Sequence, residues 1–309
     1  MNNFNEMESL CAMTFSQAGP IHHLWTPEDH EIIFTRDAEF KIAMNIMGIG
    51  ARIFPDVRIL TFEWMSNHLH LMAASDPTRL QALFDLIKTL TIRQLKVWGR
   101  PNALSRFECK HREINSLDDA RNVLVYDNRN GFLVNPATSP FTYPWGANRY
   151  YFNTDAQLRF VQSSRKMTVR EIRETVQGRF ADKIDTLLTL DGYACPMDYC
   201  DIKGGEGLFR DARHYFFSVS RNIESQKQIA AELGERIYYT DDELFAAIVA
   251  HCKSHYQLSS PTSLPAQAKI DVARLMHYEY NAGNKQIQRM LRLDAGTVGT
   301  MFPQRSPKY

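Results

Sequence analysis

The first 153 residues alternate between short apolar runs and longer stretches in which apolar residues recur every three or four positions. Short runs are typical of buried strands, and the three-to-four spacing is typical of amphipathic helices. The order of the segments predicts β-α-β-β-α-β-α, which indicates an α+β domain built on an antiparallel sheet with flanking helices. The expected strands are residues 21–25, 57–64, 67–74 and 107–114, and the expected helices are residues 37–50, 78–98 and 117–130.

The segments around this block carry different patterns. Residues 1–19 are polar with scattered apolar side chains, which predicts an irregular lead-in. Proline and aromatic residues gather in residues 135–153, which predicts an ordered, packed excursion. Residues 155–258 are mainly helical in pattern, with helices expected at 169–180, 184–190, 212–219, 225–233 and 241–256.

A Pro/Ser stretch at residues 258–265 predicts a boundary. Together with the change of composition near residue 150, it divides the chain into three expected domains. These are an α+β domain at residues 1–153, a helical domain of unassigned role at 154–258, and a helical segment at 259–309.

Composition excludes several classes of protein. Of the 309 residues, 44% are hydrophobic and 23% charged, which indicates a globular rather than a disordered chain. The 36 basic and 35 acidic residues give a net charge of +1, so a uniformly basic nucleic-acid coat is excluded while local basic surfaces are not. No apolar run approaches the roughly 20 residues that span a bilayer, which predicts a protein without membrane contact. Five scattered cysteines fit a reducing, cytoplasmic location, and Cys195 and Cys200 form only a weak zinc signal.

Two histidines, His68 and His70, flank Leu69 in the expected strand 67–74. Residues i and i+2 of a strand project from the same face, so these imidazoles can hold one divalent metal if another element supplies a third ligand. Imidazole suits Mn, Zn, Ni or Fe, and with carboxylate or amide oxygens it also tolerates Mg. Spacing alone fits two histidines on a solvated strand face equally well.

The context of the pair is more specific. Residues 63–72, Glu-Trp-Met-Ser-Asn-His-Leu-His-Leu-Met, resemble the motif strand of the single-tyrosine HUH transposases, the REP-associated tyrosine transposases in particular. The family strand reads Met-Pro-Asn-His, a hydrophobic residue and His, and only its Pro is replaced, by Ser66. Further segments resemble the family in the same order, at residues 21–25 (Ile-His-His-Leu-Trp), 131–134 (Gly-Phe-Leu-Val) and 143–146 (Tyr-Pro-Trp-Gly), so that the resemblance covers roughly residues 20–150.

The resemblance implies a ferredoxin-like HUH domain that cleaves and rejoins DNA strands. In that chemistry a tyrosine hydroxyl attacks a phosphodiester and becomes linked to the 5′ end, leaving a free 3′ hydroxyl. A divalent metal, Mg or Mn, held by His68 and His70 polarises the phosphate. The implied partner is single-stranded or hairpin DNA, and the family is known both as monomers and as homodimers.

The catalytic helix departs from the family pattern. In the family an Asn four residues after the nucleophilic Tyr completes the metal site, and these two positions align with Val123 and Asp127. Tyr126 lies almost one helical turn after Val123 on the same face, and it is the expected nucleophile. The third ligand is then Asp127, by alignment, or Asn130, which keeps the i, i+4 relation to Tyr126. A carboxylate is the better ligand, which favours Asp127, and a domain that has lost cleavage is the other open reading.

Basic residues cluster in two places. Between residues 79 and 112, eight basic residues are opposed only by Asp85 and Glu108, which predicts a phosphate-binding surface or, more plainly, a solvated helix face. Residues 284–302 predict two short helices joined by 292–294, which resembles a helix-turn-helix that contacts duplex DNA, although a plain packing module fits too. The expected DNA-binding residues are Arg79, Lys88, Arg93, Lys96, Arg100, Arg106, Lys110, Arg112, Lys285, Arg289 and Arg292.

Together these features predict a metal-dependent DNA transposase or nuclease in which Tyr126 attacks. Two alternatives come from other classes of protein. One is a domesticated regulator that keeps the fold and binds DNA without cutting it, and the other is a helical interaction protein whose histidine pair is incidental.

Overall fold

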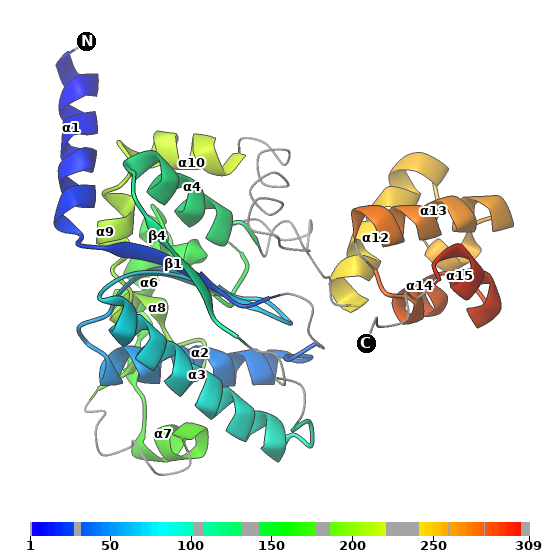
Figure 1. Cartoon of the computed structure of the whole chain (residues 1–309), viewed down its shortest axis with the longest axis horizontal. Coiled ribbons are helices and arrows are strands. Elements are labelled where there is room, and N and C mark those ends of the chain that lie inside the picture. Colours follow the sequence, from blue (N-terminus) through cyan, green and yellow to red (C-terminus); the bar gives the residue numbers. More distant parts are fainter. Residues whose placement is uncertain are drawn as a thin grey trace. The chain divides into compact units, whose positions relative to one another are not determined.

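The computed structural model describes residues 2–27, 32–101, 108–130, 142–176, 186–220, 241–258, 260–280 and 282–303. Arg106, the segment 131–134 and the expected helix 225–233 lie outside these ranges. The chain forms two compact units, each described here by itself (Figure 1). One unit comprises residues 1–131 and 138–229, and the other comprises residues 132–137 and 230–309, a division that differs from the expected boundaries after residues 153 and 258.

A four-stranded antiparallel sheet forms the centre of the first unit (Figure 1). Its strands are β1 (Ile21–Trp25), β2 (Arg58–Trp64), β3 (Leu69–Ala74) and β4 (Lys110–Ile114), in the spatial order β2-β3-β1-β4. The apolar runs of β1 and β3 are buried along their whole length, as the sequence pattern predicts. The edge strand β4 is short, charged and mostly exposed, which protects an open sheet edge from pairing with other chains.

Helices cover both faces of this sheet. Helices α2 (Asp37–Ile53) and α3 (Pro77–Val97) pack against each other on one face, and α4 (Leu117–Asp127) lies on the other (Figure 1). Helix α3 begins where the Asp76 carboxylate accepts the backbone N–H of Thr78 at 2.8 Å. The predicted α+β class, its strands and these helices are therefore confirmed within a few residues.

The expectation of an irregular N-terminal lead-in is wrong. Residues Asn2–Gln17 form helix α1, which packs against α4. In α1 Cys11 is buried, whereas Phe4, Leu10 and Met13 remain exposed, so the apolar stripe that normally marks a helix is faint. That weak pattern is the reason the sequence does not reveal the helix.

The Pro- and aromatic-rich excursion is ordered where the structure describes it. Tyr143 donates its hydroxyl to the carbonyl of Trp64 at 2.6 Å, and the carbonyl of Trp145 accepts the N–H of Trp64 at 2.8 Å. A Cβ on Gly146 would lie 2.6 Å from the carbonyl oxygen of Phe62, so only glycine allows this close approach. The segment thus runs along the outer edge of β2.

Residues 154–220 pack onto the sheet domain rather than forming a separate one. The Asn45 side chain of α2 accepts the N–H of Ala194 at 2.8 Å, and the carbonyl of Ile59 in β2 accepts the N–H of Asp201, also at 2.8 Å. The helix expected at 184–190 is wrong, because residues 188–190 form a strand of a small sheet. This sheet comprises β5 (Arg165–Lys166), β6 (Leu188–Leu190) and β7 (Tyr193–Ala194), and the neighbouring helices are η1 (Asn148–Tyr150), α6 (Thr154–Ser163), α7 (Val169–Val176), α8 (Pro196–Tyr199), α9 (Ile202–Glu206) and α10 (Ala212–Ser220).

The second unit is helical in its described residues. Leu264 lies in its buried core, so residues 258–265 are a packed connection inside the unit rather than a boundary. Arg292 ends α14 in the left-handed region at φ 50°, and the Asp294 side chain accepts the N–H of Thr297 at 2.8 Å to begin α15. The elements are α12 (Asp241–Tyr256), η3 (Pro261–Ser263), α13 (Ala266–Glu279), α14 (Asn284–Leu291) and α15 (Ala295–Met301), which confirms the predicted C-terminal helices. In neither unit does a described helix have the length and apolarity needed to cross a bilayer.

Candidate metal centre

Three buried side chains converge on the sheet face that α4 covers. The antiparallel register of β1 and β3 pairs Trp25 with His70 and His23 with Met72. Directly paired residues share a face, so His23 and His70 project from the same side of the sheet. Asp127, the last residue of α4, reaches the same point, and these three residues could hold a metal ion; they are called the metal-binding group.

The donor atoms of this group are close enough to share one ion. His23 Nε2 lies 3.0 Å from Asp127 Oδ1, His70 Nδ1 lies 3.6 Å from the same oxygen, and the two ring nitrogens are 3.4 Å apart. Three atoms bound to one divalent ion at about 2.1 Å, with angles of about 90–120° between them, lie about 3.0–3.6 Å apart. The group therefore could hold one metal ion.

Burial sets the electrostatics of the group, because all three side chains are fully buried. Burial raises the pKa of Asp127, and the nearby His23 opposes that rise. Burial also holds the pKa of His70 well below its ordinary value, with a further contribution from the charges of His68 and His23. A bound dication favours both the ionised carboxylate and the neutral imidazole, so it would relieve the cost of burying them together.

The ligand chemistry also fits a metal. Two imidazoles and one carboxylate are a common donor set for first-row divalent ions. Within the described part of the chain, neither Oδ2 of Asp127 nor Nδ1 of His23 has a hydrogen-bond partner. The carboxylate thus keeps an oxygen that no protein donor occupies.

The predicted ligands are only partly brought together. His68 and His70 lie side by side as expected, with ring centroids 4.8 Å apart. His68, however, precedes β3 in a turn closed by the Met65 N–H on its carbonyl, and its Nδ1 lies 2.8 Å from Asn67 Oδ1, so it stands outside the three-residue group. Asn130 is buried, and its side-chain nitrogen has no hydrogen-bond partner among the described residues.

His23 is the member of this group that the sequence pattern does not predict. The i, i+2 rule selects pairs within one strand, whereas His23 meets His70 across two strands. The doublet His22-His23 in a short apolar run was the available signal, since alternation places one of the two histidines on each face. Which of the two histidines faces His70 depends on the register of β1 with β3, and the sequence pattern does not determine that register.

Tyr126, the predicted nucleophile, lies beside this group. Its ring packs edge-on against His70, with centroids 5.3 Å apart and planes at 85°. Only 1% of Tyr126 is exposed. Val123, which aligns with the family's tyrosine position, is buried on the same helix.

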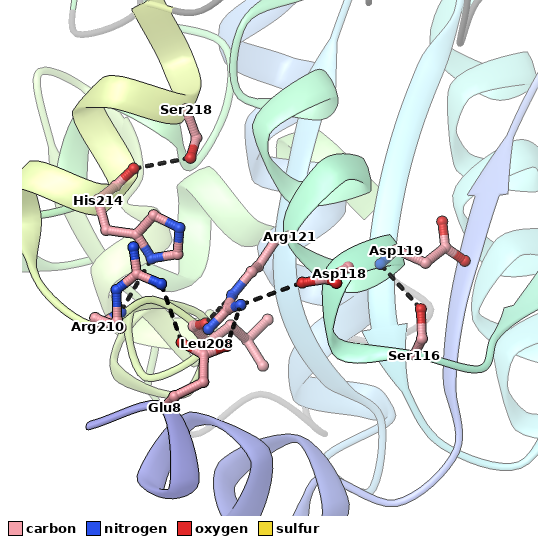
Figure 2. A network of polar contacts seen from close by, with 9 residues as sticks. All are labelled: Glu8, Ser116, Asp118, Asp119, Arg121, Leu208, Arg210, His214 and Ser218. Atoms are coloured by element: carbon pink, nitrogen blue, oxygen red, sulfur yellow. Dashed lines mark hydrogen bonds and ion pairs between the residues drawn. The ribbon is translucent and has the colours of Figure 1, made fainter. Parts of the chain in front are cut away.

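The first turn of α4 is fixed by Arg121. Figure 2 shows its guanidinium between α1 and the segment that follows α9. It donates to Glu8 at 2.7 Å, to Asp118 at 3.2 Å and to the carbonyl of Leu208 at 2.7 Å. Arg210 donates to the same Glu8 carboxylate at 3.1 Å and so belongs to the same network of polar contacts (Figure 2).

The last turn of α4 is held from two sides by Asn128. Thr61 of β2 donates its hydroxyl to the Asn128 side-chain oxygen. The Asn128 nitrogen donates to the hydroxyl of Tyr215 in α10 at 3.0 Å. Since Asp127 is the neighbouring residue, these bonds fix the carboxylate over the two histidines.

The predicted basic surface is divided between the two faces of the sheet. Register pairs Arg112 with His23 and Lys110 with Trp25, so both basic residues lie on the face of the metal-binding group. Arg112 also forms a bidentate ion pair with Asp119 of α4, at 2.6 and 2.8 Å.

The other predicted basic residues of the first unit lie elsewhere. Helix α3, on the opposite face of the sheet, carries four of them: Arg79 in its first turn, and Lys88, Arg93 and Lys96 further along. Arg79 pairs with Asp56 at 2.5 Å and Arg100 with Glu39 at 2.6 Å. The structure therefore does not bring these residues to the metal-binding group.

In the second unit, the predicted basic residues are exposed. Lys285 and Arg289 lie on α14, and Arg292 follows it. Helix α15 carries no charged residue, so the positive charge of the predicted helix-turn-helix resides on α14 and the turn.

No family model, no curated protein and no solved structure matches this chain. The arrangement of its own buried side chains is therefore the basis for assigning a function. A buried His-His-Asp group lies on an antiparallel sheet, with a tyrosine ring against one of the histidines.

Proposed function

We propose that this protein is a metal-dependent DNA strand transferase that cleaves and rejoins single-stranded or hairpin DNA through Tyr126. The observation that carries the proposal is the contact of the Tyr126 ring with His70, a member of the metal-binding group His23, His70 and Asp127. This reaction requires a nucleophile beside a metal-binding group. Here α4 carries Tyr126 and Asp127, and the sheet face beneath it carries His23 and His70.

The topology supports the same proposal. The βαββαβ order with strands in the order β2-β3-β1-β4 is that of the ferredoxin-like split β-α-β unit. The HUH resemblance implies such a ferredoxin-like domain, and one face of this sheet points away from α2 and α3. His23 and His70 lie on that face, beneath α4.

The reaction exchanges one phosphoester for another. The Tyr126 oxygen forms a bond to phosphorus, and the bond from phosphorus to the 3′ oxygen breaks. The phenol releases its proton to solvent, and the leaving 3′ oxygen takes up a proton from solvent. The products are a 5′-phosphotyrosine and a free 3′ hydroxyl, and attack by a 3′ hydroxyl on the phosphotyrosine restores a DNA strand and the phenol. When bound, the metal supplies Lewis-acid polarisation of the phosphate.

The donor atoms of the group influence which divalent metal it binds more tightly. Mg²⁺ prefers an octahedron of oxygen atoms and keeps several waters, whereas Mn²⁺ accepts imidazole nitrogen readily. Two of the three donors are imidazoles, so we propose that Mn²⁺ binds more tightly than Mg²⁺. Lys110 and Arg112 lie on the same sheet face and would attract the DNA backbone toward the site.

Covalent trapping on labelled DNA tests this function. The full chain is incubated with Mn²⁺ and a panel of hairpin and single-stranded oligonucleotides, each labelled in turn at the 3′ and the 5′ end. Because the protein retains the fragment downstream of the break, through its 5′ phosphate, only the 3′-labelled strand should migrate with the protein on a denaturing gel. The 5′-labelled fragment should be released with a 3′ hydroxyl that a polymerase can extend, and a polymerase-inert fragment or a 5′-labelled adduct would contradict the proposal.

A DNA-binding protein that does not cut is the second candidate. The observation that favours it is the complete burial of Asp127 and near-complete burial of Tyr126, together with Val123 at the family's nucleophile position. DNA binding by gel shift with no adduct on any substrate, with or without Mn²⁺, would select this candidate.

A further inference from the structure

The other face of the sheet carries three further side chains of metal-ligating type, which come from β1 and β4. The register of β1 and β4 places His22 directly opposite Glu113 and Leu24 opposite His111. His111 and Glu113 are i and i+2 of one strand, so all three polar side chains project from the same face. Alternation along β1 turns His22 away from His23 and α4, so this is the opposite face of the sheet, on which α2 and α3 lie (Figure 1).

His22 is the unusual member of this second group. Only 4% of it is exposed, and within the described part of the chain neither ring nitrogen has a hydrogen-bond partner. A buried imidazole left without partners is unfavourable, so such a group marks a place where something else binds. The charged groups that face it are the carboxylates of Glu113 and Asp76 and the imidazole of His111.

The three side chains are neighbours on the sheet, and sharing an ion requires His111 and Glu113 to turn toward His22. The rings of His22 and His111 have centroids 6.2 Å apart, against 5.6 Å for His23 and His70. His111 and Glu113 are exposed, so their side chains can rotate toward the buried imidazole without disturbing the core. Directly opposed residues on antiparallel strands have Cβ atoms about 4.5–5.5 Å apart, which is within reach of a common ligand.

We propose that His22, His111 and Glu113 bind a second divalent transition-metal ion, with Zn²⁺ as the best match. Two imidazoles and a carboxylate, with a fourth position left for water, are a familiar zinc donor set. The ion would link the edge strand β4 to the neighbouring strand β1. It is independent of the proposed DNA chemistry, because the sheet separates it from the metal-binding group of His23, His70 and Asp127.

Counting bound ions in variants tests the proposal. The chelator-treated full chain is titrated with Zn²⁺ by calorimetry, which gives the number of bound ions. Competition with a chelating dye then gives the affinity of each site. The parent should bind two ions. The double variant His111→Ala/Glu113→Gln should bind one, with the affinity of the lost site reduced by more than about 100-fold. Asp127→Asn should instead lose the other ion and keep this one.

A matched control and a second measurement separate this site from incidental binding. Glu108→Gln removes an exposed carboxylate just before β4 and should leave both ions in place. Zn²⁺ should raise the thermal midpoint of Asp127→Asn, and this rise should disappear when His111→Ala/Glu113→Gln is added. A His111→Ala/Glu113→Gln variant that binds as many ions as tightly as the parent, or an Asp127→Asn variant that binds none, would overturn the proposal.

Discussion

Asp127 Oδ1 lies 3.0 Å from Nε2 of His23, and both side chains are fully buried. The contact joins the last turn of α4 to the first strand of the sheet. It therefore links the helix that carries Tyr126 to the imidazoles that would hold a metal. The chemistry of the site depends on this junction, and most of the expected outcomes below concern it.

Replacing Asp127 with Asn should weaken metal binding without unfolding the protein. The amide has the same shape but lacks the charge, so we expect Mn²⁺ affinity to fall by more than about 100-fold. In the cleavage assay, excess Mn²⁺ should partly restore a slow reaction. Calorimetry and a Mn²⁺ titration of the cleavage rate measure the two effects, and Mn²⁺ affinity equal to that of the parent would remove Asp127 from the site.

The metal-free protein should lose stability as the pH falls below about 6.5 because of His70. Burial holds the folded pKa of His70 well below the ordinary value of 6.5, so only the unfolded chain takes up a proton there. The sign follows from linkage: this contribution is present above pH 6.5 and is lost toward acid, by up to about 1.4 kcal/mol per pH unit.

Urea unfolding of the chelator-treated protein between about pH 7 and pH 5.5 measures this loss, with His70→Asn as the comparison. The difference between the two slopes isolates His70, because the raised pKa of Asp127 acts in the opposite direction in both proteins. Parallel slopes would show that His70 titrates normally.

Tyr126→Phe should abolish cleavage and leave DNA binding intact. The substitution removes one hydroxyl and keeps the ring that packs on His70, so the stability should change by no more than about 1 kcal/mol. Covalent trapping and a gel shift are the two readouts. If the variant cuts as well as the parent, the nucleophile lies elsewhere, and the buried Tyr150 and Tyr151 are the next candidates.

Neutralising the basic side chains of α14 should weaken duplex binding. Lys285→Gln, Arg289→Gln and Arg292→Asn are combined in the full chain, with Asn chosen because it tolerates the left-handed backbone at position 292. Each lost phosphate contact should lower the slope of log affinity against log salt by about 0.9.

The matched control for α14 is a triple substitution to Gln at three exposed basic residues of the first unit, Lys166, Arg170 and Arg173. It changes the net charge equally and should leave the salt slope near that of the parent. Equal losses in both triple variants would indicate a general charge effect rather than a DNA-binding α14.

Arg121→Met should loosen α4 and with it the metal-binding group. The change removes three hydrogen bonds, including one of the two arginine contacts to Glu8, and we expect a loss of about 2–4 kcal/mol. Faster hydrogen exchange in α4 and weaker Mn²⁺ binding should accompany it. Arg170→Met breaks an exposed i, i+4 pair with Glu174 and should cost less than about 0.5 kcal/mol.

Local pattern predicted the elements whose apolar residues are regular. Helix α3 was found because Leu80, Leu83 and Ile87 recur at helical spacing and are buried in the structure. Strand β6 was missed because it has three residues, too few for a period to show, and its sequence Leu-Thr-Leu fits either state.

The candidate site was predicted as far as it depends on neighbours in sequence. His70 was predicted from its spacing to His68, and Asp127 from the alignment that the family resemblance implies. His23 was not, because its contact with His70 exists only once β1 and β3 are paired in register. The division of basic residues between the two sheet faces escaped prediction for the same reason.

The two histidines of β1 also affect how the strand is aligned. A slip of one residue exchanges the faces of a strand, so it would turn His22 toward α4 and His23 toward α3. Each face would still receive an imidazole, and metal binding alone would discriminate poorly between the two alignments. The alignment is instead set by Leu24, which is buried in the core, and by Thr26, whose hydroxyl accepts the N–H of Leu69 at 3.0 Å beyond the end of the strand. Substitution of Thr26 should therefore favour a misaligned strand with an intact complement of ligands.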